Sequence, residues 1–549
     1  MRLVVLSALL VSQALPAQLA IINGKVWTGD SRKPWAEAVL MDGDRIRLVG
    51  TTAEVRAAAL GAQTVDALQR TVMPGFNDAH IHFLSGSLGL SQIDLTGVCS
   101  VEAMQRLIAA YASANPQKKW ITGRGWEYYC FPDKLPRKEW IDAVVKDRPV
   151  FLSAYDGHTG WANSKALEMA DINRATKFEG FGEIVKDPAT GQPTGSLKEG
   201  AMSLVRKHVP ATTREEKLAA LRTGMKMAAR LGITSFQNAS GDEDELSLYE
   251  ELGRQGEISM RAAIAMSVSP SAPPVRVDQI AALRSKQRHP YLRVGAVKLM
   301  IDGVIESHTA AMLAPYADDP KAIGEPAWPV PQFNDVVARL DAKGIQIYTH
   351  AIGDRGVRLT LDAYENAAKT NGKRDSRHRV EHIETIHPDD LPRFAKLGVM
   401  ASMEPIHADP DTVEVWSKAV GPARLPLSFA WRSLEKAGAR VVFSSDWPAS
   451  ISVNPIRGIH NAVNRRTVDG KPPGGWLPEQ RVSLETALHG YTTQAAYASF
   501  EEATKGMIRA GMLADVIILS HDIFAIDPVK LHEATVVCTV FNGNVIYRR

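Results

Sequence analysis

The sequence predicts a mixed α/β fold, a (β/α)8 TIM barrel with a β-sandwich domain formed by both chain ends and an inserted subdomain. The first observation is an alternation of short apolar runs with helical stretches such as residues 213–232 and 333–344, which is typical of a parallel sheet. The second is that eight such runs can be found: residues 71–82, 232–239, 260–268, 292–302, 345–353, 378–385, 399–405 and 440–448. The third is a length of 549 residues, too long for one ordinary domain. Eight strand–helix units predict a barrel.

The first residues of the chain have the order of a secretory signal peptide. Arg2 is followed by an apolar stretch from Leu3 to about Leu10 and then by small residues as far as Ala17. The basic region is thin, and the alternative is an ordinary apolar N-terminal strand. We expect residues 1–17 to be removed and the protein to be exported, to the periplasm or outside. No later segment has the roughly 20 consecutive apolar residues that a membrane span needs.

The two ends of the chain differ from its middle. Residues 18–73 and 505–549 are short runs rich in Val, Ile and Leu that are joined by Asp-Gly and Asn-Gly turns, and they predict one composite β-sandwich. Residues 74–504 then form the barrel domain. The interval from about residue 83 to 231 is too long for one strand–helix connection, and an insertion over residues 95–205 is expected to cover one mouth of the barrel.

Composition indicates a soluble globular protein that binds small molecules. Hydrophobic residues make up 45% of the chain, and 64 basic against 61 acidic residues give a net charge of +3. This balance excludes a strongly basic surface of the kind that binds nucleic acid or anionic lipid. Whether the chain forms a homodimer stays open. Cys99, Cys130 and Cys538 are odd in number and far apart, so buried free thiols are expected.

Several predicted strands end in residues that bind metals. His80 and His82 end the first run, and alternation of side chains along a strand points both imidazoles to one side. His350, His382 and Asp446 follow the fifth, sixth and eighth runs. Taken singly, either histidine could be an ordinary hydrogen-bonded residue at the rim of the barrel, and the aspartate could be a helix cap. Together they predict a metal site at the C-terminal rim, where a TIM barrel assembles its active site.

The most specific segments extend over nearly the whole chain after residue 73: PGFNDAHIH (74–82), DGHTGWANSKAL (156–167), GQPTGSLKE (191–199), VKLMIDG (297–303), THAIGDRGV (349–357), RVEHIE (379–384), SSDWP (444–448) and KGMIRAGMLADVIIL (505–519). By these segments the sequence resembles the amidohydrolase superfamily, and within it amidohydrolase family 3, the branch that includes N-substituted formamide deformylases. The resemblance implies a metal-binding TIM barrel that carries a β-sandwich. Matched position by position, it implies these metal ligands: His80, His82, Lys298, His350, His382 and Asp446.

Lys298 lies in the apolar run VGAVKLM, where an isolated ammonium group is costly to bury. It should therefore be neutralised, paired or modified. The resemblance implies a carboxylated lysine, which would be an anionic ligand able to bridge two cations. The alternative is an ion pair with Asp302 or another barrel carboxylate.

These ligands predict a metal-activated hydroxide as the nucleophile. The resemblance implies a metal-dependent hydrolase that uses it to cleave a non-peptide C–N bond, in an amide, formamide or related compound. One or two Zn²⁺ ions are expected, although imidazole and carboxylate ligands also suit other divalent metals. Asp446 is predicted to accept the proton of the attacking water and pass it to the leaving amine. The alternatives are an esterase or lactonase on the same metal site, and a non-catalytic secreted binding protein.

Two further residues have competing interpretations. By the resemblance His158 lies near the substrate and holds an oxyanion or carbonyl, whereas the alternative is a turn that caps the helix beginning near Asn163. Glu404 stands where the resembling family often has glutamine. It could favour an amine-bearing substrate, or pair with Arg424 or Arg457.

The remaining candidates are supporting groups. Asn77 and Asp78 are expected to fix the orientation of the imidazoles. His308 stands where relatives often have arginine, which puts an anion-clamping role there in doubt. A cluster of aromatic residues in the insertion is expected to wall an apolar substrate pocket or to form a small core: Trp120, Trp126, Tyr128, Tyr129 and Phe131.

Overall fold

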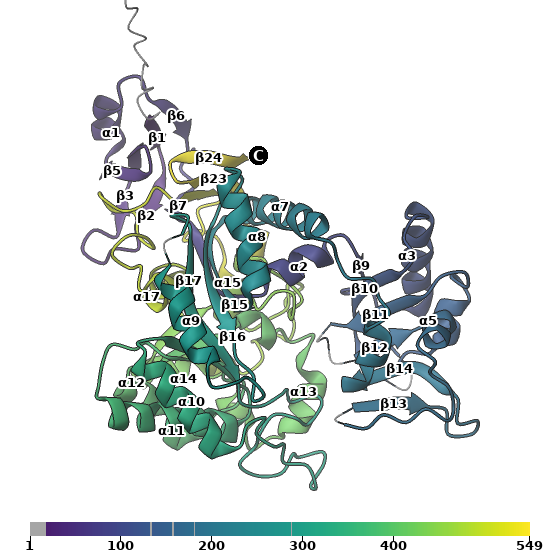
Figure 1. Cartoon of the computed structure of the whole chain (residues 1–549). Coiled ribbons are helices and arrows are strands. Elements are labelled where there is room, and N and C mark those ends of the chain that lie inside the picture. Colours follow the sequence, from purple (N-terminus) through teal and green to yellow (C-terminus); the bar gives the residue numbers. More distant parts are fainter. Residues whose placement is uncertain (1–17, 132–133, 156, 158, 181, 287) are drawn as a thin grey trace, which may run out of the picture.

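The computed structural model describes residues 18–549 except 132–133, 156, 158, 181 and 287. The predicted signal peptide therefore lies outside the described residues. Figure 1 shows three parts: a barrel surrounded by helices, a β-sandwich at its upper left and an inserted lobe at its right. No helix in the described part of the chain is both long and apolar enough to span a membrane. The predicted fold class, an α/β barrel with additional β-sheets, is confirmed.

The barrel is a sheet of eight parallel strands, and each predicted apolar run coincides with one of them, except that β15 extends two residues beyond its run. In barrel order they are β8 (Phe76–Ile81), β15 (Ile233–Gly241), β16 (Arg261–Ser267), β17 (Leu292–Met300), β18 (Gln346–Ala351), β19 (Arg379–His382), β20 (Met400–Met403) and β21 (Arg440–Phe443). Backbone hydrogen bonds join the end of β8 to the segment after β21, from Asp446 N to His80 O (2.8 Å) and from His82 N to Trp447 O (2.8 Å). These bonds close the barrel at the rim where the predicted ligands lie.

Helices surround the barrel strands (Figure 1). They are α2 (Phe83–Gly89), α7 (Arg214–Arg230), α8 (Glu243–Arg254), α9 (Arg276–Ser285), α10 (Val330–Ala342), α11 (Asp354–Asn371), α12 (Leu391–Leu397), α13 (Val413–Val420), α14 (Trp431–Lys436), α15 (Pro455–Asn464), α16 (Leu484–Gly490) and α17 (Thr493–Ala498). α7 begins where its sequence predicts, because Thr213 and Glu216 form a reciprocal capping box. The apolar side chains of the helices pack on the strands in one large core.

The first predicted run divides between two sheets. β7 (Thr71–Pro74) belongs to the sandwich and β8 to the barrel, and Gly75 lies between them. A Cβ atom at Gly75 would come within 2.3 Å of the Thr234 hydroxyl, so only glycine fits this crossing without a shift.

The sandwich combines both chain ends in two sheets. The first has the order β5-β4-β1-β6 and the second β24-β23-β22-β7-β2-β3. The strands are β1 (Gln18–Ile22), β2 (Lys25–Trp27), β3 (Trp35–Ala36), β4 (Ala38–Asp42), β5 (Arg45–Gly50), β6 (Gln63–Asp66), β22 (Val516–Leu519), β23 (Val536–Phe541) and β24 (Asn544–Arg548), with the helix α1 (Thr52–Ala58). Apolar residues from both ends share one core, in which Ile21 and Val540 are fully buried.

The inserted lobe is a six-stranded sheet with helices. Its order is β13-β14-β12-β11-β10-β9. The elements are β9 (Ile93–Asp94), α3 (Val101–Ala114), β10 (Ile121–Trp126), α4 (Lys138–Asp142), β11 (Val150–Ala154), β12 (Thr159–Ala162), α5 (Ser164–Met169), β13 (Gly182–Lys186), β14 (Pro193–Glu199) and α6 (Ser203–Arg206). Trp126 and Phe131 are buried in the core of the lobe, and Trp120 in a second one. Tyr128 packs against the first core, and Tyr129 is largely exposed. The aromatic cluster is therefore a structural core rather than a substrate wall.

The expectation of three free thiols is wrong for two of them. Cys99 and Cys130 form a disulfide, with their Cα atoms 4.8 Å apart, whereas Cys538 is free and buried. The physical reason is the parallel pairing of β9 with β10, which brings the segments that follow these strands together. This pairing cannot be read from the 31-residue separation of the two cysteines.

Candidate metal centre

The predicted ligands come together at one end of the barrel. His80 lies on β8, Lys298 on β17 and His350 on β18, while His382 ends β19. His82 follows β8, and Asp446 follows β21. Because parallel strands end at the same rim, residues separated by more than 300 positions become neighbours.

Two of these residues have unusual backbone conformations. His382 has φ of 72° and Asp446 φ of 54°, both in the left-handed region that side chains other than glycine rarely adopt. Such conformations persist where surrounding structure holds them, and they cluster at functional sites. Here His382 is the last residue of β19, and Asp446 lies three residues after the end of β21.

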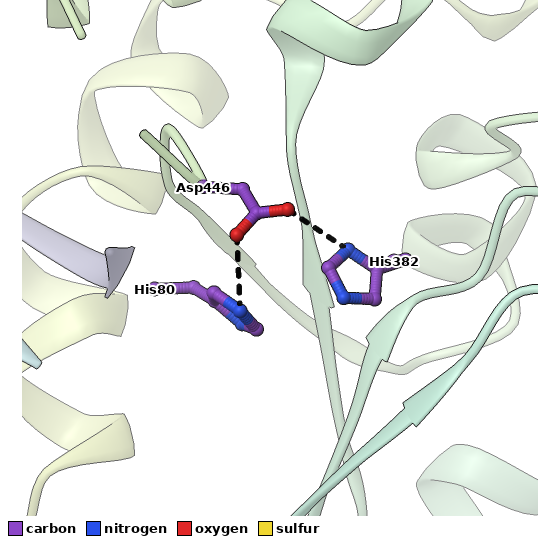
Figure 2. A group of neighbouring side chains, drawn as sticks. All are labelled: His80, His382 and Asp446. Carbon is purple, nitrogen blue, oxygen red and sulfur yellow. Dashed lines mark ion pairs between the residues drawn. The ribbon is translucent and has the colours of Figure 1, made fainter. Parts of the chain in front are cut away.

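Asp446 lies at the centre of the cluster. Figure 2 shows its carboxylate between the imidazoles of His80 and His382. The Oδ1 atom is 3.1 Å from Nε2 of His82 and 3.3 Å from Nε2 of His80, and Oδ2 is 3.9 Å from Nδ1 of His382. The Nζ atom of Lys298 lies 3.2 Å from Nε2 of His80. The ring centres of His350 and His382 are 4.5 Å apart.

Each imidazole has a hydrogen-bond partner on one ring nitrogen. Nδ1 of His80 lies 2.5 Å from Glu381 Oε2, and Nδ1 of His382 lies 2.9 Å from Glu404 Oε2. The other two pairs are His82 Nδ1 with the Ser240 hydroxyl (2.9 Å) and His350 Nε2 with the Gly303 carbonyl (3.0 Å). Such partners fix the tautomer and leave the second nitrogen of each ring for a metal.

Electrostatics favours the ligand forms of His350, His382 and Asp446. Burial lowers the pKa of His350 and of His382 well below the usual histidine value, which keeps both rings neutral. Burial also lowers the pKa of Lys298. Although burial disfavours a charged carboxylate, the imidazoles of His80 and His82 hold the pKa of Asp446 well below its usual range.

The cluster fits a divalent cation. His80, His382 and Asp446 each offer a ligand atom, all within 4.8 Å of one another. The Oδ1 atom of Asp446 is buried and makes no hydrogen bond among the described residues, although two imidazole nitrogens lie within 3.3 Å of it. Imidazole nitrogen and carboxylate oxygen that converge without hydrogen bonding are the donor set expected around Zn²⁺ or a similar ion.

The ion pair expected as the alternative for Lys298 is not formed among the described residues. Asp302 does not pair with it, because its carboxylate accepts hydrogen bonds from the backbone N–H groups of Ala311, Ile352 and Gly353. Among the described residues, no carboxylate lies within ion-pair distance of the Lys298 ammonium. A buried lysine that faces imidazole rather than a carboxylate agrees better with a modified or neutral side chain.

Both interpretations of Glu404 are corrected. This carboxylate is buried and accepts hydrogen bonds from the His382 ring and from the Ser444 hydroxyl, 2.9 Å away. It contacts neither predicted arginine, because Arg457 pairs with Asp409 and Arg424 binds backbone carbonyls. Glu404 therefore supports a candidate ligand and does not line the substrate cavity.

The supporting roles of Asn77 and Asp78 are also corrected. Asp78 accepts hydrogen bonds from the backbone N–H groups of Ser445 (3.1 Å) and His80 (3.3 Å), so it fixes the backbone at the rim rather than an imidazole. The side chain of Asn77 is buried and makes no hydrogen bond among the described residues. His158 lies outside the described residues, so both of its interpretations stay predictions; the N-cap of α5 is Asn163. His308 pairs with Asp318 (2.9 Å).

A cavity of about 210 Å³ opens over the cluster. Five candidate ligands line it, and His80 lies fully buried behind them. Sequence reasoning missed three other lining residues: Glu384, His407 and Trp416. Trp416 donates its indole N–H to Glu384 (2.6 Å), and His407 Nε2 is 3.6 Å from Asp446 Oδ2. The only sequence signal for Glu384 is its position two residues after His382.

Comparisons with known proteins agree with this geometry. A family model described as the amidohydrolase family matches residues 63–547. The Arabidopsis thaliana protein LONG AFTER FAR-RED 3 is 31% identical over 547 residues, covering 97% of this chain and 92% of that one. N-substituted formamide deformylase of Arthrobacter pascens is 28% identical, covering 97% and 98%. A solved structure described as an uncharacterized metal-dependent hydrolase from Pyrococcus furiosus has a TM-score of 0.73 at 27% identity, covering 94% of this chain and 100% of that one. Since the family match spans most of the chain, the protein belongs to the amidohydrolase family and is a metal-dependent hydrolase of that family.

Proposed function

We propose that this protein hydrolyses a non-peptide C–N bond in an amide, a formamide or a related carbonyl compound. The observation that carries the proposal is the convergence of four histidines, Lys298 and Asp446 at one cavity. The similarity to a protein named N-substituted formamide deformylase supports the choice of bond.

The chemistry divides between the metal and the chain. A bound divalent cation, for which we propose Zn²⁺, would lower the pKa of a water molecule toward about 7 and polarise a carbonyl group. Asp446 would accept the proton of the attacking water and return it to the leaving nitrogen, because its charged carboxylate faces the cavity. Lys298, if carboxylated, would provide an anionic ligand that holds a second cation.

The apolar part of the cavity lining indicates an apolar substituent on the substrate. It is formed by Ile406, Val413, Trp416, Phe429 and Ile451. The rings of Trp416 and Phe429 are packed with their centres 4.9 Å apart. An apolar lining with a few polar groups is typical of a small-molecule site, and we propose a substrate whose apolar group lies against these rings.

A substrate panel tests the proposal. Metal-depleted protein and protein reloaded with zinc or manganese would be offered N-substituted formamides, simple amides, and esters and lactones of matched shape. Metal-dependent release of amine from a formamide or amide supports the proposal. Turnover of esters or lactones alone would favour the alternative hydrolase, and binding of metal without any turnover would favour a secreted binding protein.

We also propose that residues 1–17 direct export and are removed. The Cys99–Cys130 disulfide supports this proposal, since such bonds persist mainly in oxidising compartments. N-terminal sequencing of the protein recovered from the periplasm or medium tests it. A chain that stays in the cytoplasm with Met1 retained would contradict it.

A further inference from the structure

Arg379 is a fully buried arginine inside the barrel, beneath the candidate ligands. Its Nη1 donates to Gln237 Oε1 on β15 (2.7 Å), and its Nη2 donates to the Ala79 carbonyl on β8 (2.8 Å) and to the Ser402 hydroxyl on β20 (3.0 Å). The guanidinium also stacks on the Tyr348 ring of β18, 3.7 Å from its centre. One side chain thus contacts four strands besides its own.

The remaining bonds of Arg379 go to Glu381, two residues along the same strand. Nε donates to Oε1 (2.7 Å) and Nη2 to Oε2 (2.9 Å), which is the two-point geometry that fixes a carboxylate in orientation as well as in position. Side chains two apart on a strand face the same side, so this geometry follows from β19 itself. Glu381 is also fully buried.

Glu381 in turn holds His80. The Oε2 atom that receives the arginine bond lies 2.5 Å from Nδ1 of His80. This bond places a proton on Nδ1, and Nε2 faces Asp446 and Lys298. Although burial favours a neutral carboxyl, Arg379 holds the pKa of Glu381 well below its usual range.

We propose that Arg379 and Glu381 form a positioning relay that presents His80 as an Nε2 metal ligand. Neither residue touches substrate, and the relay acts only through the imidazole. The inference rests on the proposed metal-dependent function, and it adds two residues deep in the barrel as determinants of metal affinity.

A comparison inside the same site supports a specific role for the arginine. His382 is also held through Nδ1 by a carboxylate, that of Glu404, but the second oxygen of Glu404 accepts from the Ser444 hydroxyl instead of an arginine. Burial raises the pKa of Glu404 to about 7. The two carboxylates are therefore held differently, since Arg379 fixes Glu381 by two bonds whereas one serine hydroxyl bonds Glu404, and the relay fixes His80 more firmly.

The test measures metal affinity rather than activity. Zn²⁺ dissociation constants would be determined by competition with a chromophoric chelator for wild type, Glu381→Gln, Arg379→Met and Glu404→Gln. Ser402→Ala is the control, because it removes one hydrogen bond from Arg379 without touching Glu381. The visible spectrum of Co²⁺-loaded protein would report ligand geometry, and the melting temperature would report folding.

We expect Glu381→Gln to weaken Zn²⁺ binding by about 10- to 100-fold, the usual effect of losing a partner of a ligating histidine. Arg379→Met should do the same where it folds, Glu404→Gln should weaken binding less, and Ser402→Ala should change it little. A folded Glu381→Gln protein with wild-type affinity and an unchanged Co²⁺ spectrum would overturn the relay while leaving the proposed function intact. A wild-type protein that binds no metal would overturn both.

Discussion

Replacement of Asp446 by asparagine tests the proposed proton transfer. The two side chains have the same shape, so the contacts of Asp446 with His80, His82 and His407 can be kept in outline, and an amide oxygen can still face a cation. The amide cannot accept a proton from water. General acid–base catalysis typically contributes about 10²- to 10⁴-fold, so kcat should fall by that factor, or roughly 2.7 to 5.4 kcal/mol in the barrier.

The assay is steady-state hydrolysis of the best substrate from the panel, with metal content and melting temperature measured on the same samples. Ser450→Ala is the matched control, because Ser450 lines the same cavity and its hydroxyl bonds, among the described residues, only to the Ser452 carbonyl. The control should keep nearly full turnover. Near-normal turnover by Asp446→Asn with bound metal would refute the assignment of Asp446 as the proton acceptor.

Three further predictions concern the cavity lining, the disulfide of the insertion and the ion pair between Glu501 and Lys505 (2.9 Å). Trp416→Leu should lower kcat/KM for an N-benzyl amide about tenfold relative to its N-methyl analogue, because about 1.4 kcal/mol of apolar contact is lost; equal losses for both amides would contradict an apolar subsite. Replacing Cys99 and Cys130 by serine should lower the free energy of unfolding of the insertion by about 3 to 4 kcal/mol, given the 31-residue separation, and an unchanged thermal transition would speak against the disulfide. Burial raises the pKa of Glu501, but the positive charge of Lys505 outweighs this effect, and the pKa falls to about 2 from the ordinary 4.5. The stabilisation from Glu501 should thus be complete above pH 4.5 and disappear as the pH falls toward 2. The free energy of unfolding should be higher for wild type than for Glu501→Gln, and this difference should be larger at pH 6 than at pH 3. A difference that does not change with pH would contradict the prediction.

The barrel strands could be predicted because each is a short apolar run bounded by turns and helices. That pattern gave all eight strands and placed the candidate ligands at their C-terminal ends. Gly75 shows where the pattern is incomplete, because one apolar run continues through a glycine from the sandwich into the barrel. Only the hydrogen bonding of β7 with β22 and of β8 with β15 separates the two halves.

The groups that support the ligands could not be predicted in the same way. Glu381 and His80 are separated by 301 positions, and their hydrogen bond depends on the order of strands in the closed barrel. Glu404 stands out in the sequence, but its hydrogen-bond partner does not. That partner is His382, whose backbone has a left-handed conformation that the sequence does not indicate. The Cys99–Cys130 bond was missed for a similar reason, since it requires the pairing of β9 with β10.

The number of metal ions per chain, measured by mass spectrometry of digested wild-type and Lys298→Ala protein, tests the central claim most directly. A hydrolase site with a carboxylated lysine bridge predicts two equivalents in wild type and one or fewer in Lys298→Ala. One equivalent in both proteins would remove the bridge and leave a mononuclear site. No bound metal in either, after reconstitution with zinc or manganese, would contradict the account of this site as a metal-dependent hydrolase.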